Sequence, residues 1–108
     1  MRLITARTVA AFSREHAHTR QALADWVAIV KAARWTSAAD LQRCVAGVRP
    51  ISEKRLVFNI MGNKYRIICD VQYADAQRNG IVRVQFIGTP AEYDKIDTQS
   101  VVFRPTDP

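Results

Sequence analysis

The sequence predicts an α+β fold, with N-terminal helices packed on an antiparallel β-sheet and a short C-terminal helix. Two observations lead to this prediction. Amphipathic helical patterns occupy the first part of the chain, and β-rich runs with alternating polar and apolar residues follow them. At 108 residues the chain is long enough for one domain with a modest core. We expect residues 1–108 to form this single domain, with about residues 99–108 as a loosely held tail.

The first part of the chain reads as a short strand followed by helices. Met1–Ile4 is apolar enough for an initial strand, and Thr5 is expected to cap a helix that ends near His16. A second helix, roughly Thr19–Ala33, has a clear amphipathic stripe formed by Leu23, Trp26, Val27 and Val30. Ser37 begins a third, short helix that ends near Val45.

The centre of the chain is a predicted β-hairpin. Two β-rich runs, Arg55–Ile60 and Lys64–Tyr73, flank Gly62-Asn63, which suits a two-residue turn because glycine readily adopts a positive φ. With that turn, Asn59 lies opposite Arg66 and Arg55 lies opposite Asp70. Because side chains alternate between the faces of a strand, one face of the hairpin is apolar and the other is cationic. The predicted apolar face comprises Leu56, Phe58, Ile60, Tyr65, Ile67, Cys69 and Val71; the cationic face comprises Arg55, Asn59, Lys64, Arg66 and Asp70, with Lys54 just before it.

A further strand and a short helix follow the predicted hairpin. In Ile81–Gly88, the apolar residues Val82, Val84 and Phe86 alternate with polar ones, and Arg83 could join the cationic face. Thr89-Pro90-Ala91-Glu92 is a capping box with proline at the first helical position, followed by a short helix with Tyr93 and Ile96. Val101–Phe103 is expected to add a last strand.

Charge and cysteine content narrow the function classes. The chain has 16 basic and 10 acidic residues, a net charge of +6, and residues 47–66 around the hairpin turn contain five basic residues against one acidic residue. This local surplus favours nucleic acid or an acidic protein partner. Cys44 and Cys69 are too few for a disulfide framework, and no His or Cys spacing indicates a metal. We expect no cofactor, no membrane span and a cytoplasmic location.

The cationic face has a simpler interpretation as well. Arg55 and Asp70 would form a cross-strand ion pair, and the remaining basic residues would be solvated edge charges. The pattern alone leaves this alternative open.

Two segments resemble signature blocks of the HigB family of bacterial type II toxins. They are residues 55–68 (RLVFNIMGNKYRII) and 86–97 (FIGTPAEYDKID), and the likeness extends from residue 1 to about residue 98. The resemblance implies a RelE-like fold and a ribosome-dependent mRNA endonuclease. It also implies a HigA-type helix-turn-helix antitoxin as partner, with operator DNA bound only through that antitoxin.

The resemblance implies metal-free RNA cleavage, in which the ribose 2′-OH attacks the adjacent phosphate. This reaction needs a base, cations for the phosphorane and an acid for the leaving oxygen. Arg66, whose planar guanidinium can bind two phosphate oxygens, suits the phosphate role. The expected catalytic residues are Arg66, Lys64, Tyr93 and Glu92, and the expected RNA-binding residues are Lys54, Arg55, Asn59 and Arg83. Tyr93 could equally be a helix-to-core anchor.

The sequence departs from the family pattern at Pro90. The pattern usually reads THAEYD, and its histidine is the favoured acid–base group, whereas this chain reads TPAEYD. Three explanations stay open: another acid–base group acts here, the chain is a deliberately weakened toxin, or it is a degenerate member that only binds. The alternative function is therefore a non-catalytic, antitoxin-binding transcriptional co-regulator. A general single-stranded RNA binder is disfavoured, because Tyr65 and Tyr73 are expected on the core side.

Overall fold

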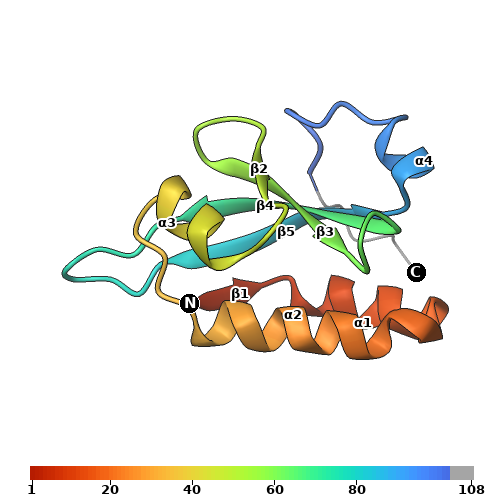
Figure 1. The fold of residues 1–108 in the computed structure, drawn as a ribbon, viewed down its shortest axis with the longest axis horizontal. Coiled ribbons are helices and arrows are strands. Elements are labelled where there is room, and N and C mark those ends of the chain that lie inside the picture. The colour runs from red at the N-terminus through yellow and green to blue at the C-terminus, as the bar shows by residue number, and fades with distance from the viewer. Residues whose placement is uncertain (103–108) are drawn as a thin grey trace.

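The computed structural model describes residues 1–102 and consists of a helical layer beneath a curved sheet (Figure 1). The helical layer contains α1 and α2, joined by a short 3₁₀ turn, η1; α3 and α4 are short helices outside it. The helices are α1 (Ala6–Glu15), η1 (Ala17–Thr19), α2 (Arg20–Ala32), α3 (Ala38–Cys44) and α4 (Pro90–Tyr93). The strands are β1 (Arg2–Ile4), β2 (Arg49–Pro50), β3 (Arg55–Ile60), β4 (Tyr65–Gln72) and β5 (Ile81–Gly88).

The described residues form one five-stranded sheet with the order β1-β5-β4-β3-β2. The predicted α+β class is confirmed, but the sheet is mixed, because β1 pairs with β5 in parallel while the other neighbours are antiparallel. The prediction of an antiparallel sheet is therefore wrong at this edge. Strand β1 precedes both long helices, and nothing in its three residues specifies the strand that it joins or the direction of pairing.

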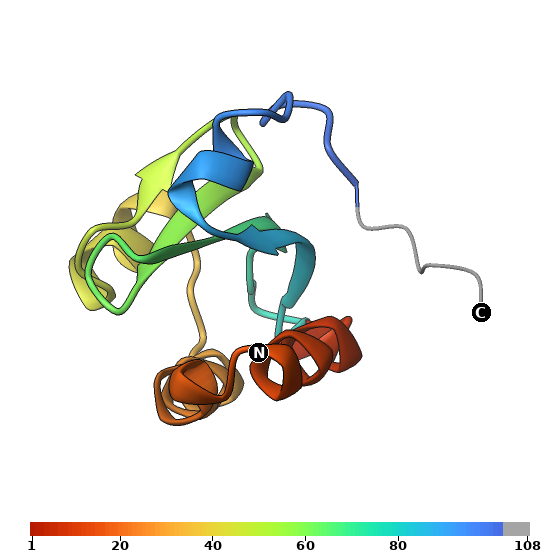
Figure 2. The same ribbon diagram turned by 90° about the vertical axis from the view of Figure 1, so that its right-hand side faces the viewer.

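The hydrophobic core lies between the sheet and the pair α1–α2, which lie side by side beneath one sheet face (Figure 2). Leu23, Trp26 and Val30 of α2 are buried, which confirms the predicted stripe, with Val27 only partly buried. Trp26 packs edge-on against Phe58 at 5.5 Å between ring centroids. The predicted apolar face of the hairpin is buried at every position, with Phe58 and Ile67 almost fully enclosed.

Thr5 precedes α1 as predicted, but its side chain does not cap the helix. Its backbone is in the left-handed region, with φ of 69°. The hydroxyl instead accepts a hydrogen bond from the Val84 N–H at 3.0 Å and donates to the Val84 carbonyl at 3.1 Å. Thr5 therefore attaches the start of α1 to the middle of β5.

Met1 is anchored at the C-terminal end of α2. Its side chain is buried, and its ammonium donates to the carbonyls of Val30, Lys31 and Ala33 at 3.0, 3.1 and 2.7 Å. These carbonyls belong to the last turn of α2 and the residue after it, where the helix has unpaired acceptors and negative partial charge. The cation satisfies these acceptors and holds β1 beside α2.

A bulge in β5 changes the predicted alternation. Cys69 pairs with Val84 but Ile68 pairs with Phe86, so Gln85 is an extra residue between them. Beyond the bulge the faces are exchanged: Ile87 packs against the core, and Phe86 faces the other side, near Tyr93. The prediction that Phe86 shares a face with Val82 and Val84 is therefore wrong.

The C-terminal part differs from the expectation as well. Helix α4 ends at Tyr93, before Ile96. Val101 and Val102 are not in a strand, and Phe103, the remaining residue of the predicted last strand, lies outside the described residues. In the described part of the chain, no helix is long and apolar enough to cross a membrane.

Candidate functional site

The predicted register of the central hairpin is confirmed. Asn59 pairs with Arg66, and Arg55 pairs with Asp70, in the antiparallel ladder of β3 and β4. The turn differs in detail, because the positive φ values belong to Met61 (55°) and Gly62 (70°) rather than to Gly62 and Asn63. The ladder still fixes which side chains share the face turned away from α1 and α2, and we call this the outer face.

The outer face is less polar than predicted. Val57 and Ile68 lie on it by alternation and are buried, with exposures of 2% and 0%. The sequence contained the signal: Leu56-Val57-Phe58 and Ile67-Ile68-Cys69 are continuous apolar runs, which are typical of strands covered on both sides. On this side of the sheet lie α4 and the segment after it (Figure 2).

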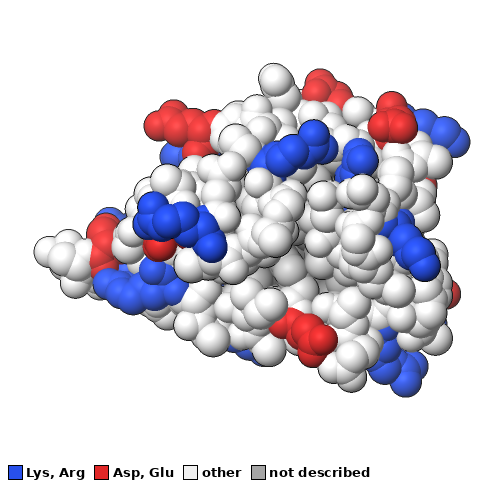
Figure 3. Space-filling view, viewed as in Figure 1, with Lys and Arg blue, Asp and Glu red and all other residues white. Residues whose placement is uncertain are grey.

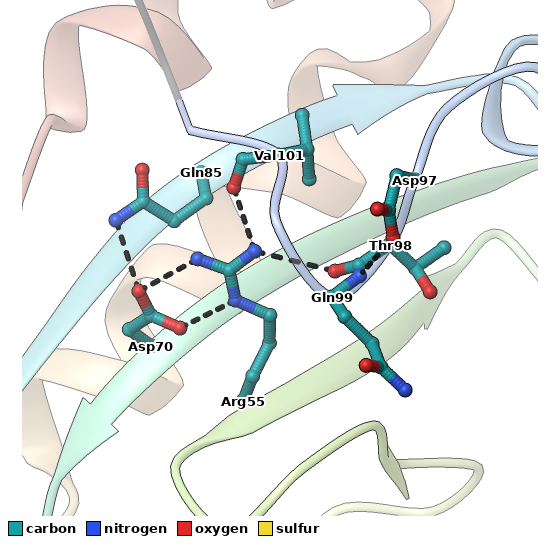
Figure 4. A network of polar contacts seen from close by, with 7 residues as sticks. All are labelled: Arg55, Asp70, Gln85, Asp97, Thr98, Gln99 and Val101. Carbon is teal, nitrogen blue, oxygen red and sulfur yellow. Dashed lines mark hydrogen bonds and ion pairs between the residues drawn. The ribbon is translucent and has the colours of Figure 1, made fainter.

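Arg55 holds the segment after α4 in place (Figure 4). It is 6% exposed, and its Nε and Nη2 donate to the two carboxylate oxygens of Asp70 at 2.6 and 2.9 Å. Its Nη1 donates to the carbonyls of Thr98 and Val101 at 3.2 and 2.6 Å. All three guanidinium nitrogens are engaged, so this position does not support the predicted RNA-binding role of Arg55. It confirms the ion pair of the simpler interpretation.

Asp70 is held ionised by this network. Hydrogen bonds from Arg55 lower the pKa of the Asp70 carboxyl below its ordinary value of 3.8, although burial acts in the opposite direction. The Gln85 side chain also donates to Asp70, at 3.1 Å. The positive charge of Arg55 therefore balances the negative charge of Asp70, and the pair repels an anion on the outer face only weakly.

Arg66 and Tyr93 meet at the hairpin end of the outer face. The guanidinium carbon of Arg66 lies 4.5 Å from the centre of the Tyr93 ring, a cation–π contact between β4 and α4. Both residues are partly exposed, and Phe86 packs on Tyr93 at 6.4 Å between centroids. The structure brings together two of the four predicted catalytic side chains and leaves them open to a ligand.

Asn59 lies opposite Arg66 on the neighbouring strand. Its side-chain nitrogen donates to the Gly47 carbonyl at 3.4 Å. Its side-chain oxygen and the Nε of Arg66 are buried, and neither has a hydrogen-bond partner among the described residues. Lys64 is exposed in the turn next to this pair. We call Asn59, Lys64, Arg66 and Tyr93 the hairpin-end site.

The Glu92 side chain caps the start of α4. Its carboxylate accepts from the Thr89 N–H at 2.9 Å, and the Thr89 hydroxyl accepts from the Glu92 N–H at 3.2 Å, with Pro90 at the first helical position. The predicted capping box is confirmed. This engagement favours a structural role for Glu92 over the predicted catalytic one.

Lys54 and Arg83 lie at the other end of the outer face. Both are exposed, and Arg83 pairs with Asp70 across the β4–β5 ladder. They line an open depression of about 480 Å³, together with Ser52, Gln72 and Gln99. Along β4, Arg66 and Gln72 are six residues apart, or about 20 Å at roughly 3.3 Å per residue. The predicted site residues therefore form two groups instead of one.

Surface charge alone does not locate the site. In the view of Figure 3, Lys and Arg side chains are scattered over the surface with Asp and Glu between them. The cations of a site are therefore distinguished by their lack of partners within residues 1–102 and by the face that they share. No group of three or more potential metal ligands occurs within residues 1–102.

Comparison with known families agrees with this geometry. A family model described as HigB_toxin, RelE-like toxic component of a toxin-antitoxin system, matches residues 19–96. This chain belongs to the HigB toxin family. It is a toxin of a toxin–antitoxin system, and it has an antitoxin as its partner. The matched region includes the hairpin, the bulged strand and α4, and so it contains both groups of cations. A search of curated proteins found no match.

Proposed function

We propose that this HigB toxin is an mRNA endonuclease whose hairpin-end site binds the phosphate that is cleaved. The observation that supports this most directly is the contact between Arg66 and Tyr93, a cation and a phenol 4.5 Å apart and both partly exposed. Arg66 supplies a fixed planar cation for phosphate oxygens. Tyr93 supplies a hydroxyl beside it that can transfer a proton.

The proposed reaction is metal-free transesterification. The ribose 2′-oxygen attacks the adjacent phosphorus, the bond from phosphorus to the 5′-oxygen breaks, and a 2′,3′-cyclic phosphate and a 5′-hydroxyl result. Arg66 stabilises the charge of the phosphorane, with Lys64 adding a second cation. The Tyr93 hydroxyl donates the proton that the 5′-oxygen takes up. With Pro90 in place of an imidazole and Glu92 engaged in the cap, the 2′-hydroxyl loses its proton to water, Tyr93 regains its proton from solvent, and the reaction is slow.

The proposed setting is that of a ribosome-dependent toxin. The substrate is mRNA on the ribosome, and neutralisation comes from a HigA-type helix-turn-helix antitoxin. Operator DNA is contacted through that antitoxin. The family match, to a toxic component of a toxin–antitoxin system, supports the toxin role and the antitoxin partner in this proposal.

The test is Arg66→Ala. We expect this variant to lose growth inhibition and to cleave mRNA on translating ribosomes about 10²–10³ times more slowly, because a preorganised cation at the developing charge is removed. Primer extension on translated mRNA measures the cut sites and their rates. Circular dichroism and the melting temperature check that the fold is kept.

Two matched variants sharpen this test. Arg66→Lys keeps the charge but loses the planar fork, and we expect only partial recovery of cleavage. Lys31→Ala removes a cation from α2 and should leave cleavage unchanged. Unchanged toxicity of Arg66→Ala would remove Arg66 from the active site.

A second candidate function is a non-catalytic, antitoxin-binding co-regulator of transcription. The confirmed capping box favours it, since Pro90 has no titratable group and the Glu92 carboxylate is engaged. Expression with and without the antitoxin gene separates the two functions. The co-regulator predicts no toxicity in either case, together with a change in operator affinity when the chain joins the antitoxin.

A further inference from the structure

The depression of about 480 Å³ at the far end of the outer face is a polar feature outside the hairpin-end site. We call it the distal groove and define it by Ser52, Lys54, Asp70, Gln72, Arg83 and Gln99. Its floor contains the ion pair of Arg55 and Asp70. A second depression of about 380 Å³ adjoins it, because both share Gln72 and Ile81, and this second one is lined by Arg2.

The charges in this region favour an anion. Lys54, Arg83 and Arg2 are exposed, and none of the three side chains has a hydrogen bond or ion pair within residues 1–102. The acid that lines the distal groove, Asp70, is already bound by Arg55 through both carboxylate oxygens. The region thus presents three unpaired cations around a neutralised carboxylate.

The ladder places these cations on the same face as Arg66. Residues at even positions of β4, from Arg66 to Asp70 and Gln72, share a face. Gln72 pairs with Ile81, and Ile81 pairs with Arg2 of β1. Arg83 pairs with Asp70 on that face as well. A strand of nucleic acid bound at Arg66 can therefore reach the distal groove on the same side of the molecule by passing over α4 and the segment after it, which lie above this face of the sheet (Figure 2).

The lining favours nucleic acid over a protein partner. Protein interfaces are centred on aromatic and apolar anchors and are depleted of lysine. No aromatic residue lines the distal groove, whereas amides, a hydroxyl and cations do. These groups suit phosphate and sugar oxygens.

We propose that the distal groove is a second phosphate-binding subsite, which holds the same RNA strand several nucleotides away from the phosphate at Arg66. Lys54 and Arg83 bind the strand there, and Arg2 extends the contact over the edge of the sheet. This inference rests on the proposed endonuclease function, because it assigns the groove to the substrate of the hairpin-end site.

The experiment compares two double variants that remove the same charge. Lys54→Ala/Arg83→Ala removes the two exposed cations of the distal groove. Arg14→Ala/Lys31→Ala removes two exposed cations from the helical layer. The probes are fluorescein-labelled, uncleavable 2′-O-methyl oligoribonucleotides of about 4 and about 12 nucleotides, the range of sizes that single-strand grooves hold. Fluorescence anisotropy at several salt concentrations measures their affinities, and melting temperatures check the fold.

We expect the groove variant to bind the longer probe at least tenfold more weakly and with a salt slope smaller by about one to two. The shorter probe, which spans only the hairpin-end site, should bind it as it binds the unaltered protein. The helical-layer variant should match the unaltered protein for both probes. Lys54→Arg/Arg83→Lys should restore most of the lost affinity.

Three results would overturn the inference. Equal losses in both double variants would show a general charge effect, and no loss for the longer probe would show that the groove does not contact RNA. Loss of antitoxin affinity with RNA binding kept would make the groove a protein interface. Failure of the proposed function is distinct from these results: Arg66→Ala would then cleave as the unaltered protein does, while the groove variant would still show weaker binding of the longer probe.

Discussion

Pro90 stabilises the start of α4, whereas a titratable side chain at the same position could take part in proton transfer. Its fixed φ suits the first position of α4, and the capping box closes around it through Thr89 and Glu92. A histidine at this position would be next to the hairpin-end site in sequence and could accept or donate a proton near neutral pH. Position 90 is therefore where stability and catalysis are expected to oppose each other.

Pro90→His should raise the rate of RNA cleavage and lower stability. The stability cost should be small, about 0.5–1 kcal/mol, because proline reduces the entropy of the unfolded chain at a compatible position. The rate should gain a pH dependence centred near the ordinary histidine pKa, at about 6.5. Cleavage rates across pH and urea unfolding measure the two effects. If both forms cut RNA equally well, position 90 takes no part in catalysis.

At the scale of elements, one ion pair connects three segments that are distant in sequence. Arg55 of β3 binds Asp70 of β4 and the carbonyls of Thr98 and Val101 (Figure 4). The segment after α4 is held on the outer face through these contacts. Removing the carboxylate should therefore loosen both the hairpin and the C-terminal segment.

Asp70→Asn should destabilise the protein by about 2 kcal/mol at neutral pH, since charged hydrogen bonds to the buried Arg55 are lost. The pKa of Asp70 is lower in the folded protein than its ordinary value of 3.8, so its contribution is complete above that value. The contribution disappears as the pH falls from there through the folded pKa. Urea unfolding as a function of pH should thus show the two proteins converging in acid.

Asp25→Asn is the matched control for this prediction. Asp25 is exposed on α2 and accepts a hydrogen bond from Gln21. Its substitution should change the unfolding free energy by less than about 0.5 kcal/mol. An equal loss of unfolding free energy in Asp70→Asn and Asp25→Asn would contradict the role assigned to Asp70. A stability difference between Asp70→Asn and the unaltered protein that persists at acidic pH would contradict it as well.

The elements also show what a sequence can and cannot predict. The register of Asn59 with Arg66 was predictable because alternation and turn chemistry both specified it. The bulge at Gln85 was not, because an inserted residue leaves no mark in a short alternating strand and is set by the fit between β4 and β5. The burial of Arg55 was not predictable either. Its guanidinium binds the carbonyls of Thr98 and Val101, which lie more than 40 residues later in the sequence.

At the scale of the whole molecule, the two sheet faces differ in how they are covered. One face is closed by α1 and α2 and contains the core, and hydrophobic periodicity predicted its residues except beyond the bulge, where Ile87 replaces Phe86. The other face is covered only in its middle, so open cations remain at both of its ends. The sequence predicted these cations but not their separation into two groups, because the C-terminal segment that divides them has no periodic pattern.

The attachment of Met1 decides where a purification tag can be placed. An ammonium has three N–H groups for the carbonyls of Val30, Lys31 and Ala33, whereas a peptide amide in a fusion has one and no charge. Residues added before Met1 should therefore lower the melting temperature by several degrees, as expected for a loss of about 1–2 kcal/mol. The same peptide added after Pro108 serves as the control, and differential scanning fluorimetry compares the two fusions. Equal melting temperatures would mean that the buried terminus contributes little to the stability of the toxin.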